Sequence, residues 1–95
     1  MTVGVLSVRL RIPAHSLKEK RTVVKSVVER VRGRFNASAA EVEDLDTWDL
    51  ATVAVVCVSN EAAHASAMLA SILAFVEGER LDAEVLDVQT ELLHL

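Results

Sequence analysis

The chain of 95 residues has little of several residue types, and each scarcity excludes a class of protein. One cysteine, Cys57, excludes an internal disulfide framework. A single proline, three glycines and 52% hydrophobic residues are typical of a packed globular chain and exclude a disordered one. No apolar run approaches the roughly 18 residues of a membrane span, and no signal-peptide pattern precedes the first predicted strand. We therefore expect one domain over residues 1–95, a cytoplasmic location and no membrane partner.

Aromatic residues are also scarce, with two phenylalanines, one tryptophan and no tyrosine. An RNA-recognition motif stacks bases on aromatic side chains of its central strands. The predicted central strand, residues 51–58, contains none. That module is excluded, and we expect no recognition of a DNA sequence.

Charge is distributed unevenly along the chain. The net charge of −4 argues against a strong nucleic-acid binder. However, residues 1–36 hold nine of the ten Lys and Arg against two acidic residues, whereas residues 37–95 hold one Arg against twelve acidic residues. This asymmetry indicates a basic surface that faces an anionic partner. Alternatively, strands from the two halves interleave, and their charges neutralise each other in space.

Hydrophobic periodicity predicts six elements in the order βαββαβ. They are strands over 3–12, 36–43, 51–58 and 83–92, a helix over 17–33, and a helix from Ser59 or Asn60 to about 76. Short connections and right-handed crossovers then favour an α+β ferredoxin-like sandwich. We expect a four-stranded antiparallel sheet in the order 4-1-3-2, with both helices on one face.

Three details of these elements are predicted as well. Gly33 should cap the C-terminus of the first helix, and Glu77-Gly78-Glu79 should end the second. In the last strand, one face should carry Leu86, Val88, Thr90 and Leu92. Its open face should place Asp87 and Glu91 beside Arg9 and Arg11, where opposite charges pair favourably.

The segment from His15 to Arg21 opens the first helix with charges of unusual sign. Ser16 and Glu19 form a capping box, which marks a helix start. A helix N-terminus carries a partial positive charge, yet Lys18, Lys20 and Arg21 crowd its first turn. A phosphate or another anion would bind such a turn favourably.

The same cations begin a longer feature, which we call the basic ridge: Lys18, Arg21, Lys25 and Arg32. These residues fall within one arc of the helix, opposite its valines, and only Glu29 interrupts them. The ridge is either a phosphate-binding surface or a solvated face with a weak Lys25–Glu29 pair. Because the capping box satisfies the helix N-terminus, the expected ligand is an extended polyanion. The candidate anion- or RNA-binding residues are His15, Lys18, Lys20, Arg21, Lys25 and Arg32.

The second predicted helix presents an alanine face, formed by Ala63, Ala67, Ala70 and Ala74. No charged residue occurs between Ala62 and Val76. Small uncharged residues let another helix approach closely, so this face is a candidate seam of a homodimer or a partner surface. Alternatively, alanine simply favours the helix and tolerates water.

Other residues with chemical potential give weaker signals. Trp48 is either a lid over the end of the core or a recognition residue. The acidic segment 41–49 lacks the ligand spacing of a calcium loop, so no metal site is expected. Cys57 should be a buried, inert thiol. His64 and His94 lack partners at metal-ligand spacing, and no catalytic residue or cofactor is predicted.

These features resemble the YlxP-like bacterial proteins, a small family of unknown function. The resemblance is carried by the segment 15–21, by Arg34-Phe35-Asn36, Glu41-Val42, Asp46 and Trp48, and by Val58-Ser59-Asn60. It implies a ferredoxin-like fold and transfers no catalytic residue. In many bacteria the family's genes neighbour those of a translation initiation factor and a ribosome-binding factor, which implies work near RNA or ribosomes. The small residues 37–40 depart from the pattern and weaken the second strand.

Three hypotheses follow. The first is a non-catalytic module that docks on RNA or a ribosomal particle through the basic ridge. The second is a homodimeric interaction or regulatory protein that does not bind nucleic acid. The third is a phosphate-processing enzyme, because acylphosphatases share the βαββαβ order. Those enzymes hold phosphate in a glycine-rich loop, whereas residues 12–16 contain no glycine. We favour the first hypothesis and expect no enzymatic activity.

Overall fold

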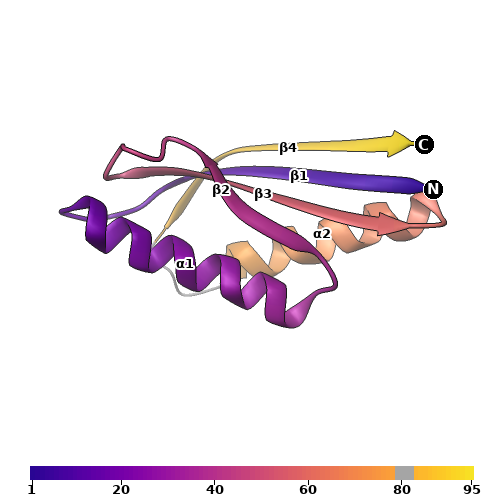
Figure 1. The fold of residues 1–95 in the computed structure, drawn as a ribbon, viewed down its shortest axis with the longest axis horizontal. Helices are drawn as coiled ribbons and strands as arrows, with labels where there is room; N and C mark the ends of the chain where they lie inside the picture. The colour runs from indigo at the N-terminus through magenta and orange to yellow at the C-terminus, as the bar shows by residue number, and fades with distance from the viewer. Residues whose placement is uncertain (79–82) are drawn as a thin grey trace.

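The computed structural model describes residues 1–78 and 83–95 and has the predicted βαββαβ order (Figure 1). Its elements are β1 (Thr2–Arg11), α1 (Leu17–Arg34), β2 (Ser38–Glu43), β3 (Leu50–Ser59), α2 (Ala62–Gly78) and β4 (Glu84–His94). No helix in the described part of the chain is long and apolar enough to cross a membrane.

The four strands form one antiparallel sheet in the order β2-β3-β1-β4. This is the predicted order 4-1-3-2 read from the opposite edge, so the ferredoxin-like α+β fold is confirmed. Both helices lie on the same side of the sheet (Figure 1). In the figure, α1 and β2 occupy one half of the elongated molecule, while α2 and both termini lie toward the other.

The core lies between the sheet and the helices. Alternate residues of β1, among them Leu6, Val8 and Leu10, are buried beneath the helices, as strand periodicity requires. They pack with apolar residues of both helices: Val24, Val27, Val28 and Val31 from α1, and Leu69, Ile72 and Val76 from α2. Cys57 is a free, buried thiol in this core, as expected. A Cβ added at Gly4 would lie 3.0 Å from the Cys57 sulfur, which explains the glycine in the centre of a strand.

The helix ends differ from their predicted positions. α1 continues through Gly33 to Arg34, and the N–H of Phe35 donates to the Val31 carbonyl at 2.9 Å. Phe35 leaves the helix in an extended conformation and packs edge-to-face on Phe75, with ring centroids 5.6 Å apart. This aromatic contact accompanies the end of α1, and the prediction of Gly33 as the cap was wrong.

The second helix begins slightly later than predicted. The Ser59 hydroxyl accepts a hydrogen bond from the Glu61 N–H at 3.1 Å, and both residues precede α2. The helix ends at Gly78, close to the predicted break; Glu79, the last residue of that predicted break, lies outside the described residues.

A β-bulge in β4 overturns part of the predicted face pattern. Arg9 pairs with Asp87 as expected, but Leu10 pairs with Val85, so Leu86 has no partner across the ladder. Val85 therefore packs on the core, whereas Leu86 is 38% exposed. The register also places Glu84 opposite Arg11, and Glu91 opposite Val5, far from either arginine. The predicted position of Glu91 was wrong.

Candidate functional site

The N-terminus of α1 is capped by side chains of its own first residues. Ser16 is extended, and its hydroxyl accepts a hydrogen bond from the Glu19 N–H at 3.1 Å. The Glu19 carboxylate accepts from the N–H of His15 at 2.8 Å, one residue before the usual capping-box partner. The predicted cap is therefore present in a shifted form, and it occupies donors that a phosphate at the helix tip would use.

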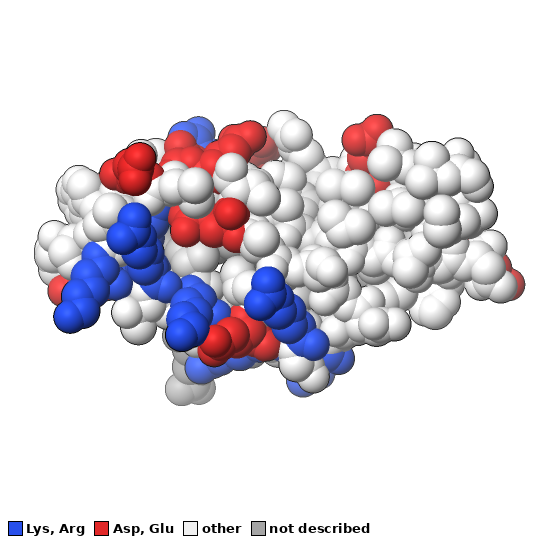
Figure 2. Space-filling model, viewed as in Figure 1, with Lys and Arg blue, Asp and Glu red and all other residues white. Residues whose placement is uncertain are grey.

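All four residues of the basic ridge are exposed on α1: Lys18, Arg21, Lys25 and Arg32. Figure 2 shows Lys and Arg side chains gathered over this helix. Within the described part of the chain, Lys18 and Arg21 form no ion pair through their side chains. Lys25 lies 3.9 Å from Glu29, and both side chains are mostly exposed, so this contact neutralises little charge.

Arg32, the last ridge residue, has a structural contact. Its guanidinium donates to the Ala39 carbonyl of β2 at 2.8 Å. This bond ties the end of α1 to the edge strand. A guanidinium has five N–H donors, so one bond leaves others for a ligand. Arg32 is thus at the end of the ridge and less free to move than the other three cations.

Lys20 lies in a different environment from the ridge. Its side chain is fully buried, and the ammonium nitrogen donates to three backbone carbonyls. These belong to Asp44 at 2.7 Å, Leu45 at 3.3 Å and Leu50 at 3.0 Å. The Glu41 carboxylate lies 2.9 Å from the same nitrogen. An ammonium has three protons, and the carbonyls use all of them.

Lys20 is therefore inaccessible to an external anion, and its prediction as an anion-binding residue was wrong. The helical spacing in the sequence could have indicated that Lys20 is buried. The buried residues of α1 are Lys20, Val24, Val27, Val28 and Val31, which follow helical spacing. Lys20 thus begins the buried valine stripe and faces the connection between β2 and β3.

That connection is held from both faces of the sheet. Asp44 has a positive φ of 60°, a conformation that Asp adopts more readily than most residues. Its carbonyl accepts from Lys20, while its carboxylate accepts from the Thr52 hydroxyl at 3.2 Å and pairs with Arg9 at 3.4 Å. The sequence showed an acidic segment here, but it did not predict these two anchors.

The sequence left two interpretations of the uneven charge, a basic surface or mutual neutralisation between the two halves. Each of them holds in a different region of the molecule. In the sheet, Arg9 lies beside Asp44 and opposite Asp87, so charges from the two halves of the chain neutralise each other. Lys20 and Glu41 do the same beneath the sheet. Along the ridge, the exposed cations have no comparable acidic partners from the described second half of the chain.

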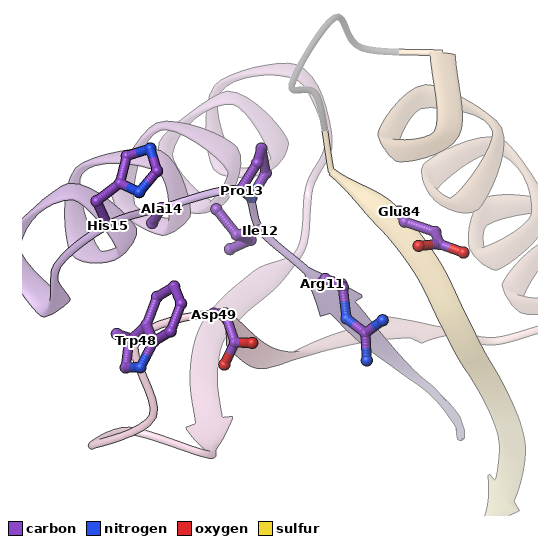
Figure 3. Close-up of a pocket in the computed structure, with 8 residues that line it drawn as sticks. All are labelled: Arg11, Ile12, Pro13, Ala14, His15, Trp48, Asp49 and Glu84. Atoms are coloured by element: carbon purple, nitrogen blue, oxygen red, sulfur yellow. The ribbon is translucent and has the colours of Figure 1, made fainter.

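A shallow pocket of about 410 Å³ lies where β1 leads into α1 (Figure 3). Its lining residues are Arg11, Ile12, Pro13, Ala14, His15, Trp48, Asp49 and Glu84. Trp48 is 51% exposed. It lines the pocket beside the buried core residues Ile12 and Ala14 and the candidate residue His15.

The chain matches a known family in sequence and a solved structure in fold. The family model described as "Protein of unknown function (DUF503)" matches residues 3–90. The chain belongs to this family. It is 38% identical over 64 residues to the "Uncharacterized protein YlxP" of Bacillus subtilis (strain 168). The aligned segment covers 67% of this chain and 70% of the relative. The solved structure of the de novo designed protein Foldit4 matches with a TM-score of 0.57 and 16% identity, over 94% of this chain and 96% of that one. The second likeness shows the fold alone.

The remaining predictions for this DUF503 chain concern the alanine face and metal binding. Ala63, Ala67, Ala70 and Ala74 are exposed on α2, where the sequence placed them. Across residues 1–78 and 83–95, no group of three or more His, Cys, Asp or Glu side chains is arranged to hold a metal ion.

Proposed function

We propose that the chain is a non-catalytic module that associates with RNA, or with a ribosomal particle through its RNA, along the basic ridge. The observation that carries this proposal is the exposure of Lys18, Arg21 and Lys25 on one flank of α1. Lys18 lies in the first turn of α1, where the helix dipole disfavours a cation by roughly 0.3–1 kcal/mol. A bound polyanion compensates that cost.

The spacing of the ridge suits a phosphate backbone. Lys18 and Lys25 are seven residues apart, which is about 10 Å along a helix. In a duplex, each strand offers a phosphate every ~3.4 Å along the helix axis, so about three phosphates face this length. Of the polyanions that fit, RNA agrees with the gene neighbourhood that the family resemblance brings.

Fluorescence anisotropy with a structured RNA tests the proposal. One variant replaces Lys18, Arg21 and Lys25 with Gln. Its matched control, Ala62→Glu with Ser66→Glu and Ser71→Glu, lowers the net charge by the same three units on exposed positions of α2. We expect the ridge variant to lose most of its affinity and the control to bind nearly as the wild type does. Equal weakening in both would mean that only overall charge matters.

The loop before α1 supports the non-catalytic part of the proposal. The Ala14 N–H donates to the Ile12 carbonyl at 2.8 Å, and the His15 N–H donates to the Glu19 carboxylate at 2.8 Å. An acylphosphatase-like site needs such N–H groups to surround a phosphate. We expect no hydrolysis of an acyl phosphate above the background rate; turnover that scales with protein concentration would contradict this.

A homodimer is the second candidate, and the alanine face favours it. Ala63, Ala67, Ala70 and Ala74 are exposed on a helix that has no charge from Ala62 to Val76. Analytical ultracentrifugation of Ala67→Glu against the wild type tests this candidate. A wild-type dimer that the substitution dissociates would support it, and an unchanged oligomeric state would count against the alanine seam.

A further inference from the structure

The pocket at the start of α1 has the form of a small-ligand site that the basic ridge alone does not use. Its volume of about 410 Å³ is within the range of roughly 300–1,000 Å³ typical of such sites. Ile12 and Ala14, both buried, belong to its lining, and the half-exposed Trp48 forms one side. Figure 3 shows Trp48 and His15 toward one end of the pocket and Arg11 and Glu84 toward the other.

Trp48 is presented by an anchored segment. The Lys20 ammonium bonds to carbonyls on both sides of Trp48 in sequence, those of Leu45 and Leu50. The carbonyl of Asp49, the next residue, accepts from the Ile12 N–H at 2.8 Å. A segment held in place before binding loses less entropy when a ligand arrives. The backbone that carries the half-exposed indole is thus fixed in advance.

The charges around the pocket indicate which part of a ligand it takes. Arg11 supplies one positive charge, and Asp49 and Glu84 supply two negative charges. A bare phosphate is therefore not favoured inside it. An uncharged aromatic ring suits the indole, and the two carboxylates can accept hydrogen bonds from an amino group on that ring, as Asp and Glu do from cytosine. Bases of every kind stack on aromatic side chains.

The pocket lies next to the start of the basic ridge along the chain. His15 lines the pocket, and Lys18, the first ridge cation, follows three residues later. We infer that the pocket takes one unpaired base of RNA, stacked on Trp48, while the adjoining phosphates follow the ridge from Lys18 toward Lys25. This inference rests on the proposed function and names the form of RNA that it recognises: a single-stranded segment.

The intrinsic fluorescence of the protein tests the stacking directly, because Trp48 is its one tryptophan. The probes are a short oligocytidine, whose bases carry amino groups, and inorganic polyphosphate, a polyanion without bases. We expect the oligocytidine to quench Trp48 and polyphosphate to leave its emission unchanged. Anisotropy of a labelled oligocytidine reports binding independently of the tryptophan.

Three variants separate stacking from structure. Trp48→Leu should weaken oligocytidine binding by about 5- to 150-fold, the range for loss of one stacked base. Trp48→Phe keeps an aromatic ring and should bind within about threefold of the wild type. Leu45→Ala changes another exposed side chain of the same connection and should have no effect. Circular dichroism confirms that each variant is folded.

The outcomes distinguish this inference from the proposed function. Binding of oligocytidine without quenching of Trp48, wild-type affinity in Trp48→Leu, or equal losses in the Leu and Phe variants would overturn the stacked base and leave the ridge intact. Equal quenching by polyphosphate would overturn it too. If neither probe nor structured RNA binds, both the inference and the proposed function fail.

Discussion

Two lysines of α1, only two residues apart, lie in opposite environments. Lys20 is fully buried, donates to three carbonyls and forms an ion pair with a carboxylate. Lys18 is exposed and makes no ion pair within the described part of the chain. Residues two apart on a helix point in different directions, so neighbouring cations of the same segment reach different surroundings.

This difference gives the two lysines different roles in the same helix: Lys20 stabilises the fold, whereas Lys18 is available for binding. Lys20 fastens the connection between β2 and β3 to α1, and removing it would leave buried polar groups without partners. Lys18, Arg21 and Lys25 contribute little to the fold, and Lys18 opposes the helix dipole. The comparison predicts that substitutions on the two sides of α1 affect different measurements.

The largest effect is expected from Lys20→Met, which keeps the length of the side chain but removes its charge. The variant removes a donor from three backbone carbonyls, of which that of Asp44 still accepts from the Thr47 N–H at 3.0 Å, and leaves the Glu41 carboxylate without its cation. Breaking a buried ion pair by removing one partner costs about 3–5 kcal/mol. We expect a loss of this size in the free energy of unfolding, measured by urea denaturation. Lys18→Met is the matched control, and equal stabilities of the two variants would break the comparison.

A smaller effect is expected from Glu41→Gln. Glu41 lies 2.9 Å from the Lys20 nitrogen, but its Oε2 atom accepts no hydrogen bond in the structure. Its contribution is therefore an attraction between charges, while the carbonyls take the lysine protons. Because the three carbonyls still hold the ammonium, we expect a loss below the ~3–5 kcal/mol of a buried ion pair that loses one partner. A loss as large as that of Lys20→Met would show that the carboxylate, not the carbonyls, dominates.

The smallest effect is expected from Lys18→Glu, and its sign is opposite. A carboxylate near a helix N-terminus is favourable, so the free energy of unfolding should rise by about 0.3–1 kcal/mol. The matched change is Lys25→Glu, in the middle of the helix. The new carboxylate would lie near Glu29, four residues later, and their repulsion should lower the free energy of unfolding by about 0.2–0.5 kcal/mol. Both variants should bind RNA more weakly. A destabilised Lys18→Glu variant would indicate that Lys18 has a structural role.

The fold was predictable because its signals are periodic. Alternation in β1 and helical spacing in α1 each identify a buried face without knowledge of the partner element. Details that depend on another strand were not predictable. The bulge that exposes Leu86 follows from pairing with Arg9 and Leu10, and the bond from Arg32 to Ala39 follows from how α1 crosses the edge strand.

The candidate site was predicted in part for a similar reason. Charge type grouped Lys20 with Lys18 and Arg21, whereas its position at the head of the valine stripe separates it from them. The residues that line the pocket around Trp48 come from the end of β1, the β2–β3 connection and the start of β4. No pattern within one of these segments predicts the pocket. His15 was singled out from sequence, but its neighbours in the pocket required the fold.

The salt dependence of RNA binding tests the central claim most directly. Anisotropy titrations over a series of salt concentrations compare the wild type with the variant in which Gln replaces Lys18, Arg21 and Lys25. If these three cations neutralise phosphates, the slope of log affinity against log salt should become shallower by about 2 to 3 units in the variant. Parallel slopes for the two proteins would contradict the account, because the ridge would then not contact the RNA.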